Sequence, residues 1–368
     1  MHLRKLSLSN FKTYGELALE FSPKLNCFIG NNGVGKTNLF DSIYYLAFCK
    51  SYFNSQDSDI IKHAEDFFLI EGEFIFDDRT ERIQCAFKPD QKKKIRRNDK
   101  EYPRLADHIG LIPLVMVSPA DGSLIMDGSE ERRRYMNSVI SQYDRQYLED
   151  LIQYNKALTH RNRVLKDFSR NQFFDDDLLV MWDEKMAETG NRIHDRRKDF
   201  VTNLMPVFQN YYSTISCGNE SVGLEYLSQL DGGDTLSLLR ENRNRDRILQ
   251  FTSAGIHRDD LILQLAGYPI KSQGSQGQQK TYLVSLKMAQ YDFLKRVAGV
   301  RPIILLDDVF DKLDSERVTQ IIRLVAADHF GQIFITDKDQ QHLNSILSSI
   351  PVDFKLFTVS PGSLKLQE

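Results

Sequence analysis

Hydrophobic residues alternate with polar ones in two segments near the start of the chain. The first runs from Leu6 to Phe21 and the second from Phe68 to Phe76. Period-two alternation is typical of strands that bury one face. We therefore predict strands of a partly antiparallel sheet. Between the two segments, an apolar run at residues 25–29 leads into a glycine-rich loop, and helical spacing follows over 38–48.

From about Glu130 the apolar spacing changes to three or four residues and continues to Leu158, which predicts one long amphipathic helix. A polar stretch at 169–177 interrupts this pattern, and a second helical run follows from Leu179 to Tyr211, so we expect a helical hairpin. Pro206 should kink or end the second helix. Arg161 and Arg197 interrupt the apolar stripes, which favours a short lobe packed partly on itself over a sustained coiled coil.

Strand and helix patterns alternate again after Gly255. Residues 261–263, 303–306 and 332–336 are predicted buried strands, and 281–297 is a predicted helix. The sequence therefore predicts an α/β domain in two pieces, residues 1–120 and 251–368, around an inserted helical lobe at 121–250.

Composition limits the partners and the compartment. The formal charge is 48 − 51 = −3, so contacts with nucleic acid would need local basic patches. No apolar run has the length of a signal sequence core or a membrane span, and we expect a cytoplasmic protein with no membrane contact. The scattered cysteines are expected to be reduced core residues, and they are Cys27, Cys49, Cys85 and Cys217.

The glycine-rich loop satisfies the pattern of a phosphate-binding loop, Gly30-x4-Gly35-Lys36-Thr37. Its backbone N–H groups would surround phosphate oxygens, Lys36 would reach the β- and γ-phosphates, and the Thr37 hydroxyl would bind Mg²⁺. The strand and helix on either side disfavour an ordinary glycine-rich turn. The predicted ATP-binding residues are Gly30, Asn31, Asn32, Gly33, Val34, Gly35, Lys36, Thr37 and Asn38.

The strand at 303–306 ends in two acids that would complete a nucleotide site. Asp307 would hold Mg²⁺ through its water shell, and Asp308 would orient or deprotonate the attacking water. We thus predict Thr37 and Asp307 as metal ligands, and Lys36 and Asp308 as catalytic residues. A strand that ends in acids is common by itself. A phosphate-binding loop in the same chain favours the interpretation that these acids belong to a nucleotide site.

A polar motif precedes the predicted helix at 281–297, where N–H groups and a positive helix dipole suit a phosphate. A flexible polar linker is the alternative. The motif consists of Ser275, Gln276, Gly277 and Gln278.

The order of these motifs, with Leu313-Asp314 last, resembles the ABC ATPase class. There, a Walker A loop, a signature, a Walker B strand and a D-loop follow one another. The resemblance implies an ABC-type P-loop ATPase head, with a mixed sheet, flanking helices and an antiparallel N-terminal sheet. It also implies a homodimer, because the signature of one chain closes on the nucleotide held by the Walker A loop of its partner.

Within that class the chain is most similar to the RecF family. The segments that carry this resemblance are 8–14, 25–26, 32–38, 257–260, 275–280 and 306–308. The family resemblance implies a weak DNA-dependent ATPase in recombinational repair and replication restart. Its ATP-bound dimer would hold duplex or gapped DNA, help RecO and RecR to load recombinase, and be reset by slow hydrolysis.

Several positions depart from the common ABC pattern. Thr336-Asp337 occupies the place of a switch histidine, and His329 and His342 lie too far away in sequence to replace it. Asp308 stands where most ABC proteins have glutamate, and Asp311 replaces the usual D-loop serine. Residues 117–121 are the expected Q-loop region. These departures favour slow hydrolysis.

A cationic stretch in a predicted hairpin is the candidate DNA contact, although a solvated surface would look the same in a chain with 27% charged residues. An SMC-like chromosome-organising scaffold is the alternative function, but the insertion is too short for long arms and a hinge. A transporter subunit would lack the helical insertion. The candidate DNA residues are Lys92, Lys93, Lys94, Arg96 and Arg97.

Overall fold

The computed structural model describes residues 1–368 except 78, 172–173, 219, 328, 339, 342–343, 345–346, 348–352 and 368. The chain forms two compact units. The head comprises Met1–Gly122, Asn210–Asn219 and Ser275–Glu368, and the lobe comprises Ser123–Gln209 and Glu220–Gly274. The sequence pattern instead predicts the second boundary at residue 250. Residues 251–274 belong to the lobe because strand β10 within them pairs with β9.

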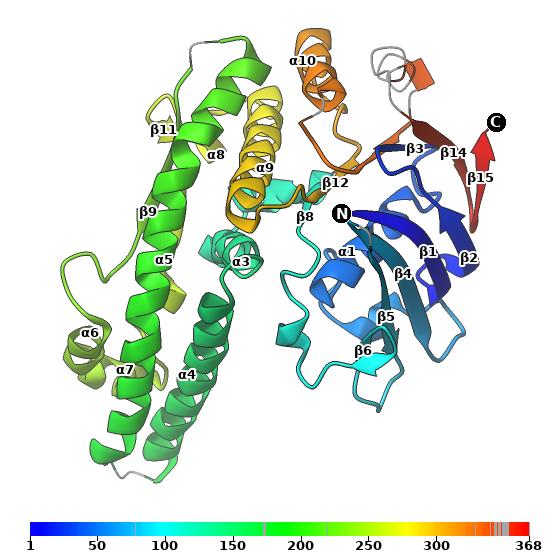
Figure 1. Cartoon of the computed structure of the whole chain (residues 1–368). Coiled ribbons are helices and arrows are strands. Elements are labelled where there is room, and N and C mark those ends of the chain that lie inside the picture. The colour runs from blue at the N-terminus through cyan, green and yellow to red at the C-terminus, as the bar shows by residue number, and fades with distance from the viewer. Residues whose placement is uncertain are drawn as a thin grey trace. The chain divides into compact units, whose positions relative to one another are not determined.

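An antiparallel sheet forms one layer of the head (Figure 1). Its order is β2-β1-β4-β5-β6-β7. Alternate positions of β4 are buried, as the period-two pattern predicts, whereas in β1 the alternation from Leu6 to Leu8 is interrupted before Leu6 by a register shift between Leu3 and Lys5. The strands are β1 (His2–Phe11), β2 (Tyr14–Glu20), β4 (Phe68–Phe76), β5 (Arg79–Phe87), β6 (Lys94–Arg97) and β7 (Lys100–Glu101).

A second, mixed sheet has the order β15-β14-β3-β13-β12-β8, with only β15 antiparallel to its neighbour. Every residue of β12 and β13 is buried, as expected for parallel strands covered on both faces. The strands are β3 (Leu25–Ile29), β8 (Leu114–Val117), β12 (Ile303–Asp307), β13 (Ile333–Asp337), β14 (Phe354–Ser360) and β15 (Ser363–Gln367).

Helix α1 (Lys36–Phe48) contacts strands of both sheets, and its side chains join them in one hydrophobic core. Phe28 of β3 stacks on Phe357 of β14 at 5.0 Å and meets Phe40 of α1 edge to face at 5.8 Å. Helix α9 (Gln276–Ala298) contacts β8. Among the described elements of the head, the other helices are η1 (Asp57–Ile60), η2 (Leu105–Asp107), η3 (Pro119–Asp121) and α10 (Ser315–Ala326).

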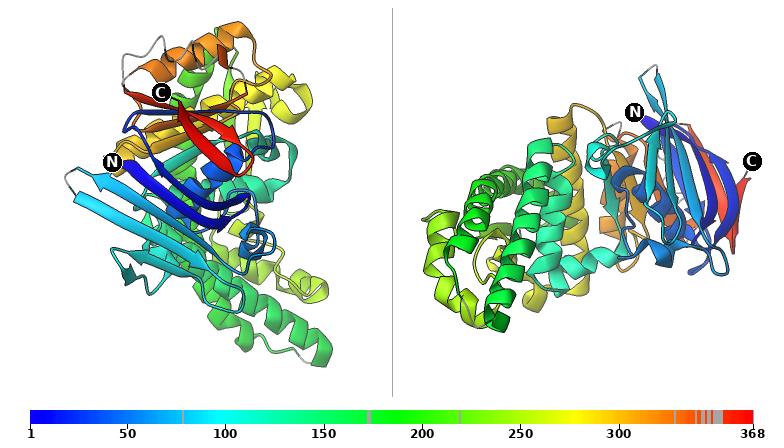
Figure 2. Two further views of the ribbon diagram at one scale, coloured as in Figure 1. Left: turned by 90° about the vertical axis from the view of Figure 1, so that its right-hand side faces the viewer. Right: turned by 90° about the horizontal axis from the view of Figure 1, so that it is seen from below.

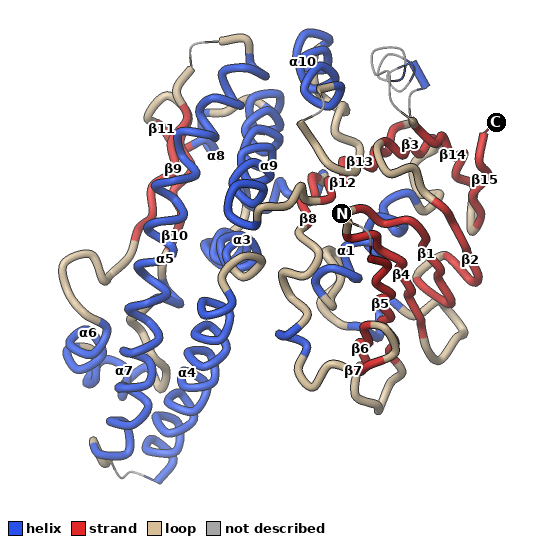
Figure 3. Tube along the Cα trace, viewed as in Figure 1, coloured by secondary structure: helices blue, strands red, loops and turns tan. Residues whose placement is uncertain are grey.

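The lobe is largely helical, with a small antiparallel sheet of order β11-β10-β9 (Figure 3). Its long helices α4 (Arg145–Asn171) and α5 (Asp177–Ser216) run side by side (Figures 1 and 2), and the last turns of α5 belong to the head. The other elements are α2 (Gly122–Met126), α3 (Ser129–Ile140), β9 (Val222–Leu227), α6 (Thr235–Glu241), α7 (Arg243–Leu249), η4 (Ile256–Arg258), β10 (Asp260–Leu265), β11 (Tyr268–Pro269) and α8 (Ile270–Gln273).

One helix prediction in the lobe is wrong, and of the two outcomes predicted at Pro206, the end of the helix is excluded. The single helix from Glu130 is two helices, α3 and α4, because Asp144 accepts a hydrogen bond from Tyr147 N (2.9 Å) and caps a new helix. Pro206 does not end α5, which continues to Ser216. The predicted break at 169–177 does separate α4 from α5, although residues 172–173 lie outside the described residues.

Three of the four cysteines occupy the predicted core positions. Cys27, Cys49 and Cys85 are buried free thiols, whereas the prediction of a core position is wrong for Cys217, which is exposed. In the described parts of the chain, no helix combines the length and the apolarity needed to cross a membrane.

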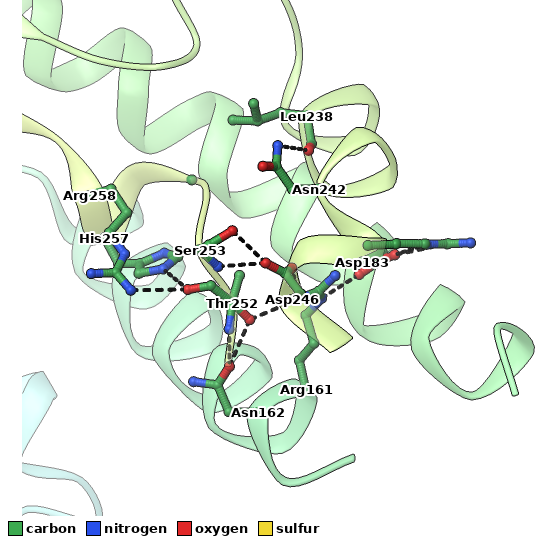
Figure 4. Close-up of polar contacts among 12 residues, drawn as sticks. Arg161, Asn162, Asp183, Leu238, Asn242, Asp246, Thr252, Ser253, His257 and Arg258 are labelled. Atoms are coloured by element: carbon green, nitrogen blue, oxygen red, sulfur yellow. Dashed lines mark hydrogen bonds and ion pairs between the residues drawn. The ribbon is translucent and has the colours of Figure 1, made fainter. Parts of the chain in front are cut away.

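Buried charges hold the lobe together where the apolar stripes are interrupted (Figure 4). Arg161 donates from Nε to Asp183 (2.7 Å) and from Nη1 to Asp246 (2.6 Å), and all three side chains are inaccessible to solvent. Arg197 likewise bonds Asp259 at 2.7 Å. Arg161 thus joins α4 to α5 and α7, and Arg197 joins α5 to Asp259, the residue directly before β10. These ion pairs pack the lobe on itself.

We predict that Arg161→Met destabilises the lobe by about 3–5 kcal/mol, because two carboxylates remain buried after their shared cation is removed. The single tryptophan, Trp182, lies on α5 and stacks on His160 at 4.6 Å, so its fluorescence in urea reports on this unit. The control is Arg134→Gln, since Arg134 is exposed and pairs only within its own helix. A change below about 1 kcal/mol in Arg161→Met would contradict the proposed role of the ion pairs.

Candidate nucleotide-binding site

The predicted phosphate-binding loop connects the end of β3 to the start of α1. Gly33 and Gly35 have φ of +80° and +113°, a region that favours glycine. A Cβ atom on Gly35 would also lie 2.8 Å from the Tyr14 hydroxyl oxygen. No acidic residue occupies the first turn of α1. The loop therefore presents a helix N-terminus suited to an anion.

Lys36 is 4% exposed and folds back over this loop. Its Nζ donates to the carbonyl oxygens of Gly30 (2.6 Å) and Asn31 (3.1 Å). The ammonium group is thus held beside the N–H groups that begin α1, so cation and backbone donors can share one set of phosphate oxygens.

Thr37 and Asp307 are brought together from positions 270 residues apart. The Thr37 hydroxyl donates to Asp307 Oδ2, with an O···O distance of 2.8 Å. A Thr37 hydroxyl that donates to Asp307 keeps its lone pairs available for Mg²⁺, and the carboxylate can reach the same ion through a bound water, so this pair fits one Mg²⁺ ion. Among the described residues, no group of three or more His, Cys, Asp or Glu could hold a metal.

Thr336 contacts both acids of the Walker B strand. Its hydroxyl donates to Asp307 Oδ1 (2.7 Å) and accepts from Asp308 N (2.9 Å). Burial raises the pKa of Asp307, and hydrogen bonds from Thr336 and Thr37 oppose the rise. Burial also raises the pKa of Asp308, with Lys36 opposing. The sequence assigns Thr336 no role beyond its place at the switch-histidine position, and the signal it offers is a hydroxyl at the end of a predicted buried strand.

His329 and His342 are the histidines that flank Thr336-Asp337 in the sequence. His329 bonds Asp292 of α9. His342 lies outside the described residues.

The turn between β1 and β2 buttresses the phosphate-binding loop, which sequence reasoning missed. Tyr14 donates from its hydroxyl to Gly35 O (2.9 Å), and Asn38 Nδ2 donates to Thr13 Oγ1 (3.0 Å). Burial raises the pKa of Tyr14, so its hydroxyl remains a donor. The sequence signal for this contact is the resemblance of segment 8–14 to the RecF family.

The predicted signature residues lie at the N-terminus of α9. Ser275 caps this helix by accepting from Gln278 N (3.2 Å), and Gln278 Oε1 accepts from Ser275 N (2.8 Å). Ser275 and Gln276 are exposed, and a Cβ on Gly277 would lie 3.0 Å from an Arg317 nitrogen of α10. This helix N-terminus is accessible to a phosphate group from another molecule.

The predicted D-loop leads into α10. Asp314 caps that helix through Arg317 N (2.9 Å), directly after Leu313.

The basic side chains of the predicted cationic hairpin are of two kinds, those that pair with a carboxylate of the head and those that are exposed without an ion-pair partner among the described residues. Lys93 pairs with Asp57 at 2.6 Å, and Arg97 pairs with Glu81 at 2.7 Å. Both contacts lie within the head. Lys92, Lys94 and Arg96 are exposed and have no ion-pair partner among the described residues. Three of the five candidate residues therefore remain as a cationic surface, which we call the β6 patch.

Comparisons with known proteins agree with this architecture. The family model RecF/RecN/SMC N terminal domain matches residues 2–356. The protein called DNA replication and repair protein RecF is 52% identical in Phocaeicola vulgatus, over 99% of this chain and 98% of the relative. The Flavobacterium johnsoniae protein of the same name is 49% identical, over 98% of this chain and 100% of the relative.

Solved structures extend the match to the fold. The recombination mediator protein RecF bound to ATP, from the RecFOR pathway, matches with a TM-score of 0.89 at 28% identity, covering 100% of this chain and 98% of that one. An Smc head bound to ScpA matches with a TM-score of 0.60 at 15% identity, over 100% and 97% of the two chains, and shows the fold alone. The predicted ABC-type P-loop ATPase head is confirmed, and the chain belongs to the RecF family.

Proposed function

We propose that this protein binds ATP with Mg²⁺, dimerises around the nucleotide and acts on DNA in recombinational repair and replication restart. The observation that carries the proposal is the 2.8 Å contact between Thr37 and Asp307, which brings the Walker A hydroxyl and the Walker B carboxylate together and supports a Mg²⁺ site beside them. The RecF relative solved with ATP supports the same ligand for this chain.

Each residue of the site has a role in the proposed reaction. The N–H groups at the start of α1 and the Lys36 ammonium bind the phosphates, while Thr37 and Asp307 hold the metal. Bound Mg²⁺ would neutralise charge that develops on the phosphate oxygens. Asp308 orients the attacking water and accepts its proton. We expect slow turnover, because Asp308 is shorter than the usual glutamate and Thr336 stands at the position where many ABC ATPases have a switch histidine.

The exposed position of the predicted signature, at the N-terminus of α9, supports dimerisation around the nucleotide. The exposed N-terminus of α9 offers the Ser275 hydroxyl and N–H groups to a γ-phosphate held by a second chain. Each dimer would then contain two sites, and each site would be assembled from both chains.

The proposed DNA and protein partners are inferred from the names of the relatives and from the β6 patch. The relatives are named as DNA replication and repair proteins, and the solved RecF structure is assigned to the RecFOR pathway, which supports RecO and RecR as partners. The β6 patch could neutralise phosphates of duplex or gapped DNA. Because chromosomal DNA lies in the cytoplasm of a bacterial cell, a protein that acts on it would be located there.

An SMC-like chromosome scaffold is the second candidate, favoured by the Smc head fold. Scaffolds of that kind need long coiled-coil arms. Helix α5 has 40 residues, or about 60 Å, and its partner α4 has 27. These lengths favour a repair clamp.

We predict that Lys36→Met weakens ATP binding at least about 100-fold, because two charge-assisted contacts to phosphate are lost. Ser275→Arg should keep ATP affinity and lose ATP-induced dimerisation, since a long cation would block the partner's phosphate. Fluorescent ATP titration and sedimentation velocity measure the two effects. Ser275→Thr keeps the capping hydroxyl and should dimerise, and dimers of Ser275→Arg at wild-type levels would refute the shared site.

Asp308→Asn should lower kcat by about 10²–10⁴-fold, because the amide cannot accept the proton of the attacking water. ATP binding should persist, so the variant should accumulate as an ATP-bound dimer. Phosphate release and dimer lifetime are measured on the same samples. Unchanged turnover would remove Asp308 from the catalytic role.

Replacing Lys92, Lys94 and Arg96 together by Gln should weaken DNA binding and lower the salt dependence of log K by up to about 3 units. The charge-matched control replaces three exposed cations of α4, Lys156, Arg163 and Lys166, by Gln. Fluorescence anisotropy with gapped duplex over a salt series measures both slopes. An unchanged slope in the β6 variant, or an equal loss in the control, would show that the β6 patch is not the DNA contact.

A further inference from the structure

The backbone of Asp308 adopts a conformation that is unfavourable for most residues. Its φ is +46°, in the left-handed region, directly after the last residue of β12. Aspartate tolerates this region better than most side chains do, but the conformation still costs free energy. Strain of this kind persists only where neighbouring groups enforce it, and it concentrates at functional sites.

Two side chains from different elements hold both polar groups of this residue's backbone. Thr336 of β13 accepts the Asp308 N–H at 2.9 Å, and Lys280 of α9 donates from Nζ to the Asp308 carbonyl oxygen at 3.2 Å. Thr336 is fully buried, and Lys280 is partly buried. The amide and the carbonyl are therefore fixed from opposite ends of the residue.

The Thr336 hydroxyl has one proton to donate and uses it on Asp307 Oδ1 at 2.7 Å. Its lone pair then accepts the Asp308 N–H. One hydroxyl thus links the carboxylate that binds metal to the residue that meets the attacking water, and valine, with the same shape, could make neither bond.

Lys280 adds a connection to the signature. It lies in the first turns of α9, the helix that Ser275 caps. Burial lowers the pKa of Lys280, and the carboxylates of Asp121, Asp311, Asp308 and Asp307 oppose the shift. Contact with the Asp308 carbonyl ties the catalytic residue to the signature helix of its own chain.

We propose that Lys280 and Thr336 are positioning residues for hydrolysis, which hold Asp308 in its left-handed conformation so that its carboxylate faces the γ-phosphate side of the site. The inference rests on the proposed ATPase function. Neither residue touches nucleotide in this scheme. Their loss should therefore affect the chemical step and leave ATP binding and dimerisation in place.

Two matched pairs of variants test the proposal in the full-length protein. Lys280→Met removes the ammonium and keeps the stem, whereas Lys280→Arg keeps a cationic donor. Thr336→Val removes the hydroxyl at constant shape, whereas Thr336→Ser keeps it. Lys295→Met removes another lysine of α9, which bonds His329 O at 3.1 Å, and serves as the control.

Steady-state ATP hydrolysis should fall at least about tenfold in kcat for Lys280→Met and Thr336→Val, with KM changed less than about threefold. Lys280→Arg and Thr336→Ser should recover kcat to within about threefold of wild type. ATP-induced dimers, measured by sedimentation, should persist in all five variants. Thermal melts identify a variant that fails to fold, and if Thr336→Val does so, the Lys280 pair decides alone.

Wild-type kcat in Lys280→Met, or an equal loss in Lys280→Arg, would overturn the positioning role. Loss of ATP binding together with kcat would assign Lys280 to the binding site and would overturn it as well. Wild-type protein that neither hydrolyses ATP nor dimerises would instead refute the proposed function, so the two failures are distinguishable.

Discussion

The nucleotide site depends on parallel pairing of β3, β13 and β12. In this register Ile29 lies opposite Asp337, and Asp307 lies opposite Thr336. Carboxyl ends of parallel strands meet at one edge of a sheet, so the phosphate-binding loop and the Walker B acids share that edge. A shift of β13 by one residue would remove the Thr336 hydroxyl from both acids and turn its side chain to the opposite face.

Both units place charges in apolar surroundings and stabilise them with specific partners. In the head, burial raises the pKa of Asp307 and Asp308, and Lys36 and hydroxyl groups oppose that rise. In the lobe, Arg161 lies between Asp183 and Asp246 without solvent contact. Such arrangements are costly to break, because a lone buried charge has no water to solvate it. They fix local geometry more strictly than apolar packing does.

Sequence patterns predicted the chemical core well, because it lies on contiguous motifs with strong local signals. The loop at 30–37, the buried strand before Asp307 and the helix after Ser275 all have the predicted form. Contacts between distant segments were not predictable in this way. Thr336, Lys280 and Tyr14 act through neighbours far away in sequence, and periodicity carries no information about such pairs. Periodicity also continued across Asp144, where a helix cap ends one helix and begins another.

The shared site is tested most directly by mixing two inactive chains, Lys36→Met and Ser275→Arg. In a mixed dimer, one site would combine the intact Walker A loop of one chain with the intact signature of the other. Half of the dimers would be mixed, each with one of two sites intact, so an equimolar mixture should reach about a quarter of the wild-type ATPase rate. A mixture no more active than the two variants measured separately would contradict a site assembled from both chains.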